Sequence, residues 1–134
     1  MNREILFRGK RVNNGEWIEG NLVEDDHDSY RMFIVTSAHW DIDEDGYTDL
    51  METEVVEVIS ETVGQYTGLT DKNGREIFEG DIVRRKERLF TVKYSTEQAR
   101  FLAFRPNGLH DPIAVKYCEV IGNIHDNPEL LKGE

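Results

Sequence analysis

The chain has 134 residues, of which 27 are acidic and 16 are basic, so its formal net charge at pH 7 is −11. This balance disfavours nucleic acid and anionic membrane surfaces as partners, because both attract basic proteins. It suits a protein that docks on a basic surface or binds cations. No apolar run approaches the ~20 residues of a membrane span, and the first residues lack the apolar core of a signal peptide. We therefore expect a cytoplasmic protein of one domain.

Short apolar runs separated by turn signals begin near the N-terminus. Glu4–Phe7 and residues 17–23 flank Asn13-Asn14-Gly15, and Asn-Gly is a strong signal for a tight turn between two strands. Residues 4–23 are therefore predicted to form a β-hairpin. Its basic cluster is interpreted as a charged strand edge that discourages aggregation, in preference to an anion contact; the cluster comprises Arg8, Lys10 and Arg11.

The middle of the chain continues the strand pattern. Met32–Thr36 is β-branched and aromatic and predicts a strand. Glu52–Glu61 fits either one face of a helix or a strand, and its three valines and isoleucine favour the strand. In Val63–Val83, Asn73-Gly74 and Glu79-Gly80-Asp81 are turn signals only a few residues apart. That spacing leaves no room for a normal helix and predicts strand, tight turn, short strand, strand.

The C-terminal half carries further strand candidates. Two of them are joined by the charged turn Lys86-Glu87-Arg88, and another ends at the turn Pro106-Asn107-Gly108, after which Leu109–Pro112 is predicted to be a loop. Asn127 and Pro128 predict a single helical turn with Asn127 as its cap. The predicted strands are Asp81–Arg85, Leu89–Tyr94, Arg100–Arg105, Ile113–Val115 and Glu119–Ile124. Many short strands with close turns indicate a mainly β protein of the barrel or sandwich class.

One acidic stretch matches the ligand spacing of a calcium-binding EF-hand loop. In a twelve-residue window from residue 41, oxygen ligands stand at positions 1, 3, 5, 9 and 12 and a glycine at position 6. The ligand candidates are Asp41, Asp43, Asp45, Asp49 and Glu52, and the glycine is Gly46. Because the flanks read as strands instead of helices, a solvated loop joining two strands is the favoured interpretation. Whether the five residues bind calcium stays open.

No pattern indicates catalysis. The single cysteine, Cys118, lies next to apolar residues and has no activating histidine nearby, so it is interpreted as a half-buried strand thiol. The histidines lack metal-ligand spacing. The tryptophans are interpreted as core or barrel-mouth residues, and the other aromatic residues as core residues. These are His27, His39, His110 and His125, then Trp17 and Trp40, then Tyr66, Phe78, Phe90, Tyr94, Phe101 and Phe104. We assign no catalytic, cofactor-binding or metal residue and expect no cofactor.

Three segments resemble the YopX family of phage and prophage proteins: REILFRGKRVNNGEWIEG (3–20), VGQYTGLTDKNGREIFEGDIV (63–83) and CEVIGNIHDNPELL (118–131). The resemblance implies a single YopX-like unit over residues 1–134 of a small, mainly β protein. It also implies a C-terminal SH3-like β-barrel, in residues 63–134. The turn pattern and the acidic stretch themselves place an N-terminal β-hairpin region with the acidic loop in residues 1–62. It carries over no catalytic residue.

Three functions are compatible with these observations. The preferred one is a non-enzymatic phage or prophage accessory protein, in the bacterial host cytoplasm, that binds a host or phage protein. The second is a calcium-binding module that uses the Asp41–Glu52 window. The third is an acidic mimic of nucleic acid that inhibits a host protein. A homo-oligomer assembled through exposed strand edges is compatible with each of them.

Overall fold

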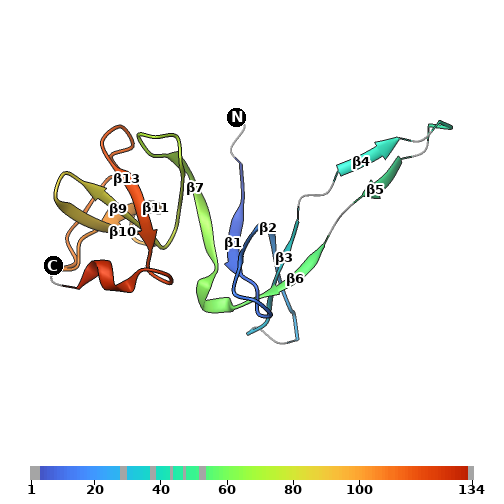
Figure 1. Ribbon diagram of the computed structural model, residues 1–134, viewed down its shortest axis with the longest axis horizontal. Coiled ribbons are helices and arrows are strands. Elements are labelled where there is room, and N and C mark those ends of the chain that lie inside the picture. The colour runs from blue at the N-terminus through green and yellow to red at the C-terminus, as the bar shows by residue number, and fades with distance from the viewer. Residues whose placement is uncertain are drawn as a thin grey trace. The chain divides into compact units, whose positions relative to one another are not determined.

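The computed structural model describes residues 4–27, 30–36, 39–42, 44–46, 48–51 and 54–132. The chain divides into two compact units, Ile5–Val63 and a C-terminal unit that begins at Gly64. Both are built from antiparallel strands (Figure 1). No helix within the described ranges is long and apolar enough to cross a membrane.

The N-terminal unit contains an antiparallel sheet in the order β6-β3-β2-β1. The predicted hairpin forms, with Phe7 opposite Gly20 and Lys10 opposite Trp17 across β1 and β2. Gly20 allows β3 to approach closely, because a Cβ there would collide with the carbonyl oxygen of Val35. The strands are β1 (Phe7–Lys10), β2 (Trp17–Glu24), β3 (Met32–Val35) and β6 (Val55–Val58), and the short 3-10 helix η1 (Ser60–Thr62) follows β6.

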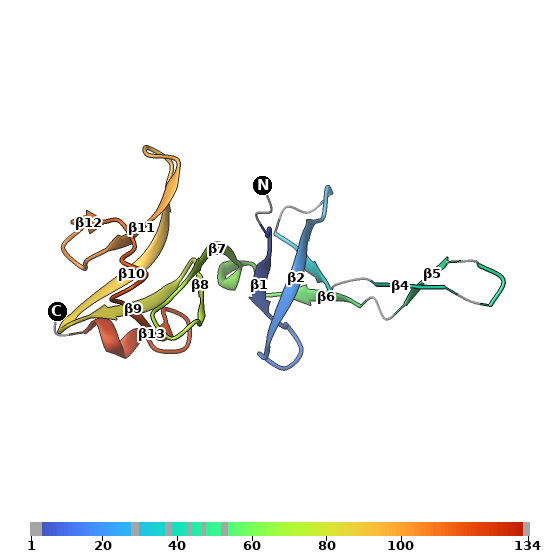
Figure 2. The ribbon, with the colours of Figure 1, turned by 90° about the horizontal axis from the view of Figure 1, so that it is seen from above.

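The acidic window is not simply a loop between two strands. β4 (His39–Ile42) and β5 (Thr48–Met51) form a two-stranded antiparallel ladder within it, and they lie side by side in Figures 1 and 2. The ladder pairs Asp41 with Asp49. The expected solvated loop is therefore replaced, over the described residues, by a hairpin.

The C-terminal unit contains a five-stranded sheet in the order β12-β11-β10-β9-β13, together with the hairpin β7-β8. Figure 2 shows the long β9-β10-β11 meander from above. The two turns predicted in residues 63–83 form as expected. The strands are β7 (Gly64–Thr70), β8 (Glu76–Phe78), β9 (Asp81–Arg85), β10 (Arg88–Ser95), β11 (Arg100–Phe104), β12 (His110–Asp111) and β13 (Glu119–Asn123).

Two local predictions were wrong. Ile113–Val115 is not a strand: the backbone turns here, and the N–H groups of Tyr117 and Cys118 both donate to the carbonyl of Ala114. The predicted loop at Leu109–Pro112 instead contains the short strand β12. The predicted C-terminal helical turn is confirmed as the 3-10 helix η2 (Pro128–Leu131), with Asn127 at its N-cap position and Pro128 at its first position. The Oδ1 of Asn127 accepts from the N–H of Asn123 and makes no capping bond to the turn.

Two buried carboxylates hold the turns of the C-terminal unit. Asp71 accepts hydrogen bonds from the N–H groups of Asn73, Arg75 and Val120, each at 2.9 Å. Asp81 accepts a 2.7 Å bond from the N–H of Phe78 and so closes the turn before β9. The apolar core packs beside them and comprises Ile77, Val83, Phe90, Val92, Ala103, Cys118 and Val120.

The mainly β prediction is confirmed. The expected SH3-like barrel is not confirmed, because the ladders among the described strands leave both sheets open. Asp81 nevertheless closes the turn that leads into the β9-β10 hairpin, and this hairpin forms one wall of the candidate site.

Candidate binding groove

The site is built on one face of the C-terminal sheet. Val83 lies opposite Phe90, and Arg85 lies opposite Arg88. Because side chains alternate along a strand and directly opposed residues share a face, these four side chains lie on the same face. The apolar pair belongs to the core. The arginine pair continues that face to the tip of the hairpin.

The neighbouring strands extend this face in the same way. Ala103 lies opposite both Val92 and Asp111. Arg105 follows Ala103 by two residues, just beyond the end of β11. Alternation therefore directs Arg105 and Asp111 to the face that carries Arg85 and Arg88.

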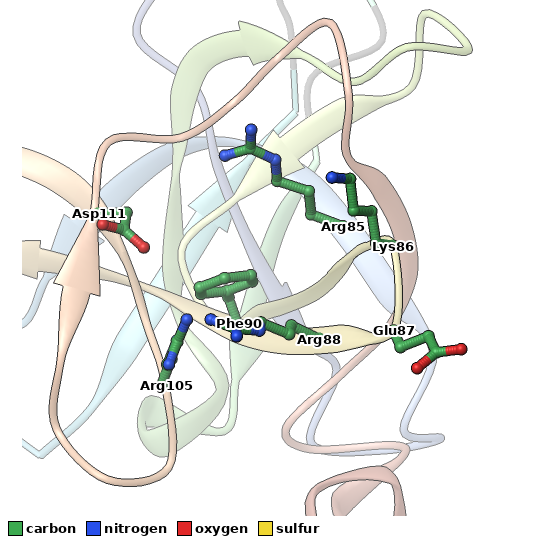
Figure 3. A pocket seen from close by; sticks show the side chains of 7 residues that line it. All are labelled: Arg85, Lys86, Glu87, Arg88, Phe90, Arg105 and Asp111. Atoms are coloured by element: carbon green, nitrogen blue, oxygen red, sulfur yellow. The ribbon is translucent and has the colours of Figure 1, made fainter.

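A depression of about 600 Å³ occupies this end of the sheet. Arg85, Lys86, Glu87, Arg88, Phe90, Arg105 and Asp111 line it (Figure 3). A second depression, of about 380 Å³, shares Arg88 and Arg105 with the first. A third, of about 500 Å³, shares Arg85 and Asp111 with it. Since each neighbour shares two lining residues with the central depression, we treat the three as one elongated surface, the basic groove.

The cationic side chains are spread along the groove. Figure 3 shows the ring of Phe90 between the side chains of Arg85 and Arg105, whose guanidinium groups lie on different sides of it. The Arg105 guanidinium carbon is 5.9 Å from the centre of that ring. The carboxylate of Glu87 points away from the other six side chains. Asp111 is therefore the carboxylate that faces the cations.

The groove contains a buried donor without a partner among the described residues and a turn residue with a positive φ. The Nε of Arg105 is buried and has no hydrogen-bond partner in the described part of the chain, and buried polar atoms are normally paired. Lys86, in the two-residue turn, has a φ of 57°. This left-handed conformation is costly for a residue with a side chain, and such strain concentrates at functional sites.

At the far end, the groove carries an aromatic side chain. Tyr117 is 64% exposed, and the guanidinium carbon of Arg85 lies 5.6 Å from the centre of its ring. Ile113 and Pro112 line the same depression. The groove therefore alternates cationic and apolar surface.

The net charge of −11 is not distributed evenly. Residues 5–63 contain 15 acidic and 4 basic residues, whereas residues 64–134 contain 11 of each. The C-terminal unit is thus neutral overall and has a locally positive groove. The total charge, from which nucleic acid and anionic membrane surfaces were disfavoured as partners, describes the N-terminal unit and not this surface.

The calcium candidates lie elsewhere. The backbones of Asp41 and Asp49 pair across β4 and β5, Asp45 belongs to the turn region of that hairpin, and Asp43 and Glu52 lie outside the described residues. β5 covers positions 8 to 11 of the window, where the EF-hand pattern leads into a helix. The described side chains include no group of three or more metal-ligating residues.

The remaining candidates have local structural roles. Cys118 is fully buried at 1% exposure, not half-buried, and burial raises the pKa of its thiol. Arg8 and Lys10 lie over the ring of Trp17, at 4.7 and 5.5 Å. Arg11 pairs with Glu54 at 3.5 Å. The basic cluster is thus engaged within its own unit.

Most of the aromatic residues predicted for the core are at least partly buried. Tyr66, Phe78 and Phe90 are fully buried. Tyr94 is not, since 45% of its surface is exposed and it packs only edge-on against Phe101. The side chains of His39 and Trp40 lie outside the described residues.

Sequence reasoning missed the arginines of the groove. The available signal was the alternation itself, because in both β9 and the segment after β11 a buried apolar residue is followed two positions later by an arginine. The pairs are Val83 with Arg85 and Ala103 with Arg105. What the sequence did not supply was the register that brings these arginines together.

Comparisons with known proteins identify a family and a structure of similar fold. No curated protein matches the chain at a significant level. Protein EF1440 from Enterococcus faecalis, known from its crystal structure, is similar in fold, with 24% sequence identity and a TM-score of 0.62. The similarity covers 98% of this chain and 100% of that one. The family described as YopX protein matches residues 6–132, nearly the whole chain, as the three resembling segments implied. The chain belongs to the YopX family.

Proposed function

We propose that this protein is a non-enzymatic binding module that recognises another protein through the basic groove. The observation that carries the proposal is the juxtaposition of Arg85, Arg88 and Arg105 around Phe90 on one sheet face. Arginine and aromatic residues are enriched where protein interfaces gain most of their affinity. The wider role is that of a phage or prophage accessory protein acting in the bacterial cytoplasm on a host or phage protein.

The chemistry of the groove supports binding over catalysis. Arginine remains protonated in proteins, so the guanidinium groups that dominate the lining supply hydrogen-bond donors and charge but do not transfer protons. Cys118 lies beneath the surface and its thiol has a raised pKa, which disfavours the nucleophilic thiolate.

Affinity capture from a lysate of the host bacterium tests this function. The bait is the full chain in three forms: wild type, the groove variant Arg88→Glu with Arg105→Glu, and the control variant Arg100→Glu with Lys132→Glu. The control makes the same change in charge at exposed positions outside the groove. We expect one or more proteins that bind the wild type and the control and are lost from the groove variant. Equal capture by all three, or turnover of a defined substrate by the wild type, would contradict the proposal.

The uneven charge favours a second candidate function, an acidic mimic of nucleic acid. With 15 acidic and 4 basic residues in residues 5–63, the N-terminal unit has the sign of a nucleic-acid backbone. Such a mimic would compete with DNA for a basic host protein, and its competition would weaken as salt is added. A surface potential that is scattered, with no contiguous acidic stripe on the N-terminal unit, would count against it.

We also propose that the C-terminal unit is SH3-like. In the order β13-β9-β10-β11-β12, strands β9 to β12 lie side by side in sequence order, and β13, the last strand, pairs with β9. This is the pairing expected of a small, partly open five-stranded barrel. An experimental structure in which β7 and β8 lie far from both ends of this sheet would exclude it.

A further inference from the structure

We infer that the ligand of the basic groove is an extended acidic peptide segment of the partner protein, with apolar residues between its carboxylates. The inference rests on the proposed function and adds the chemistry of the ligand. It draws on the shape of the groove, the placement of its cations, its single inward-facing carboxylate and its exposed aromatic end.

The shape favours an extended ligand. The depression that contains Arg88 and Arg105 continues on one side toward Leu89 and on the other toward Tyr117. Compact ligands occupy single pockets of roughly 300–1,000 Å³. Three depressions joined in a row match a strand of peptide better than one small molecule.

The cations favour several separated anionic groups. The Arg85 guanidinium lies on a different side of Phe90 from that of Arg105, so the two do not converge on one point (Figure 3). A single phosphate is held best by converging donors. Carboxylates that recur along a peptide can instead meet these arginines one at a time. The buried Nε of Arg105 provides a donor that is still without a partner among the described residues.

Asp111 distinguishes a peptide from a nucleic acid. This exposed carboxylate lines the central depression and the one that contains Tyr117, and it accepts hydrogen bonds but donates none. A peptide backbone offers N–H donors to it, whereas a sugar–phosphate backbone presents repelling anions. The groove also offers only four cations in its central depression. Nucleic-acid affinity depends on neutralising many phosphates.

The apolar surface provides the anchors for the residues between the carboxylates. Tyr117 is 64% exposed, and Leu89 and Ile113 line the two outer depressions. Side chains at alternate positions of an extended peptide point in opposite directions. We therefore assign to the groove a segment in which acidic and large apolar residues are interleaved.

Fluorescence anisotropy with labelled peptides tests this inference on the full chain. The probe is a peptide of interleaved glutamate and leucine or phenylalanine residues. Its comparisons are a peptide with the glutamates replaced by lysines, a peptide of equal charge with the apolar residues replaced by serine, and an oligothymidylate of similar length. We expect the first peptide to bind at least about tenfold more tightly than each comparison, and its binding to weaken severalfold as salt screens the charges.

The variants connect binding to the groove. We expect Arg88→Glu with Arg105→Glu to weaken peptide binding about tenfold or more, while Arg100→Glu with Lys132→Glu leaves it within about twofold. Circular dichroism of each variant establishes that its fold is intact. Tighter binding of the oligothymidylate, equal binding of the serine-substituted peptide, or an unchanged affinity of the groove variant would overturn the inference.

The two experiments fail in different ways. If the captured partner is lost from the groove variant but the acidic peptide does not bind, the groove recognises a protein of other chemistry and only the ligand assignment is wrong. If neither the partner nor the peptide depends on the groove, the proposed function itself is wrong. Self-association of the wild type that the groove variant abolishes would make a second copy the occupant and would also overturn the inference.

Discussion

Asp71→Ala tests how much of the C-terminal fold depends on one buried carboxylate. Asp71 is 6% exposed and accepts hydrogen bonds from three backbone N–H groups, two in its own turn and one from Val120 in β13. The bond to Val120 spans 49 residues of sequence and joins the turn to the last strand. Truncation removes the acceptor of all three donors at once.

The expected cost follows from where those donors lie. Val120 is 7% exposed, and a buried donor left without a partner costs about 1–3 kcal/mol. The donors of Asn73 and Arg75 lie in an exposed turn, where water replaces the lost acceptor, so each contributes about 0.5–1 kcal/mol. The sum is about 3 kcal/mol. With an m-value of about 2 kcal/mol per molar in urea, the midpoint of unfolding should fall by about 1.5 M.

A matched control separates burial from turn chemistry. Asn107 accepts a bond from the N–H of Leu109 in an exposed turn of the same unit, and we expect Asn107→Ala to cost only about 0.5 kcal/mol. Because both tryptophans, Trp17 and Trp40, lie in the N-terminal unit, urea unfolding followed by tyrosine fluorescence and by circular dichroism gives both values. A loss for Asp71→Ala no larger than that for Asn107→Ala would refute the reasoning.

The same carboxylate gives a dependence on pH with a defined sign. Burial raises the pKa of Asp71, and the hydrogen bonds from Val120, Arg75 and Asn73 lower it. The lowering is the larger effect, so the pKa in the folded protein lies below its ordinary value of 3.8. A lowered folded-state pKa stabilises the protein above the unfolded value, and this contribution is lost as the pH falls through the folded value. The difference in stability between wild type and Asp71→Asn should therefore be constant near neutral pH and shrink below about pH 4.

The remaining predictions concern backbone geometry and the acidic hairpin. Lys86→Gly should stabilise the protein by about 1 kcal/mol, because glycine adopts a φ of 57° without the steric strain of a side chain. Its control, Lys72→Gly, changes a turn residue without a positive φ and should destabilise the protein. A lower melting temperature for Lys86→Gly than for Lys72→Gly would contradict the prediction. Gly20→Ala should destabilise the N-terminal unit by about 2–3 kcal/mol through the collision with Val35, while Asn21→Ala, at the exposed neighbouring position, should stay within about 0.5 kcal/mol. Calcium at about 1 mM should leave the melting temperature unchanged. The reason is that the strand β5 occupies the end of the window, where a helix begins in an EF-hand. A rise in melting temperature would contradict this, because it would show that calcium binds the folded state.

Local turn chemistry explains why the strand order could be predicted so far. Gly74 and Gly80 have φ values of 82° and 93°, so the two turns that organise residues 63–83 were encoded in residue types that favour this conformation. The segment at Ile113–Val115 shows the limit. Its β-branched residues favour a strand, but the backbone turns at Ala114, where two N–H groups donate to one carbonyl.

Long-range pairing explains what could not be predicted. The bond from Val120 to Asp71 and the approach of Arg105 to the ring of Phe90 depend on contacts between segments that are distant in the sequence. Composition also misled, because the total charge hid a neutral C-terminal unit. The groove becomes visible only when strand alternation is combined with register.

The most direct test of the groove as a binding surface is a titration of the isotopically labelled full chain with the interleaved acidic peptide, followed by amide chemical-shift changes. We predict that the shifts concentrate in residues 85–90 and 105–117 and saturate, and that Arg88→Glu with Arg105→Glu suppresses them. Saturating shifts confined to the N-terminal unit, or no shifts at peptide concentrations that saturate the anisotropy signal, would contradict the account.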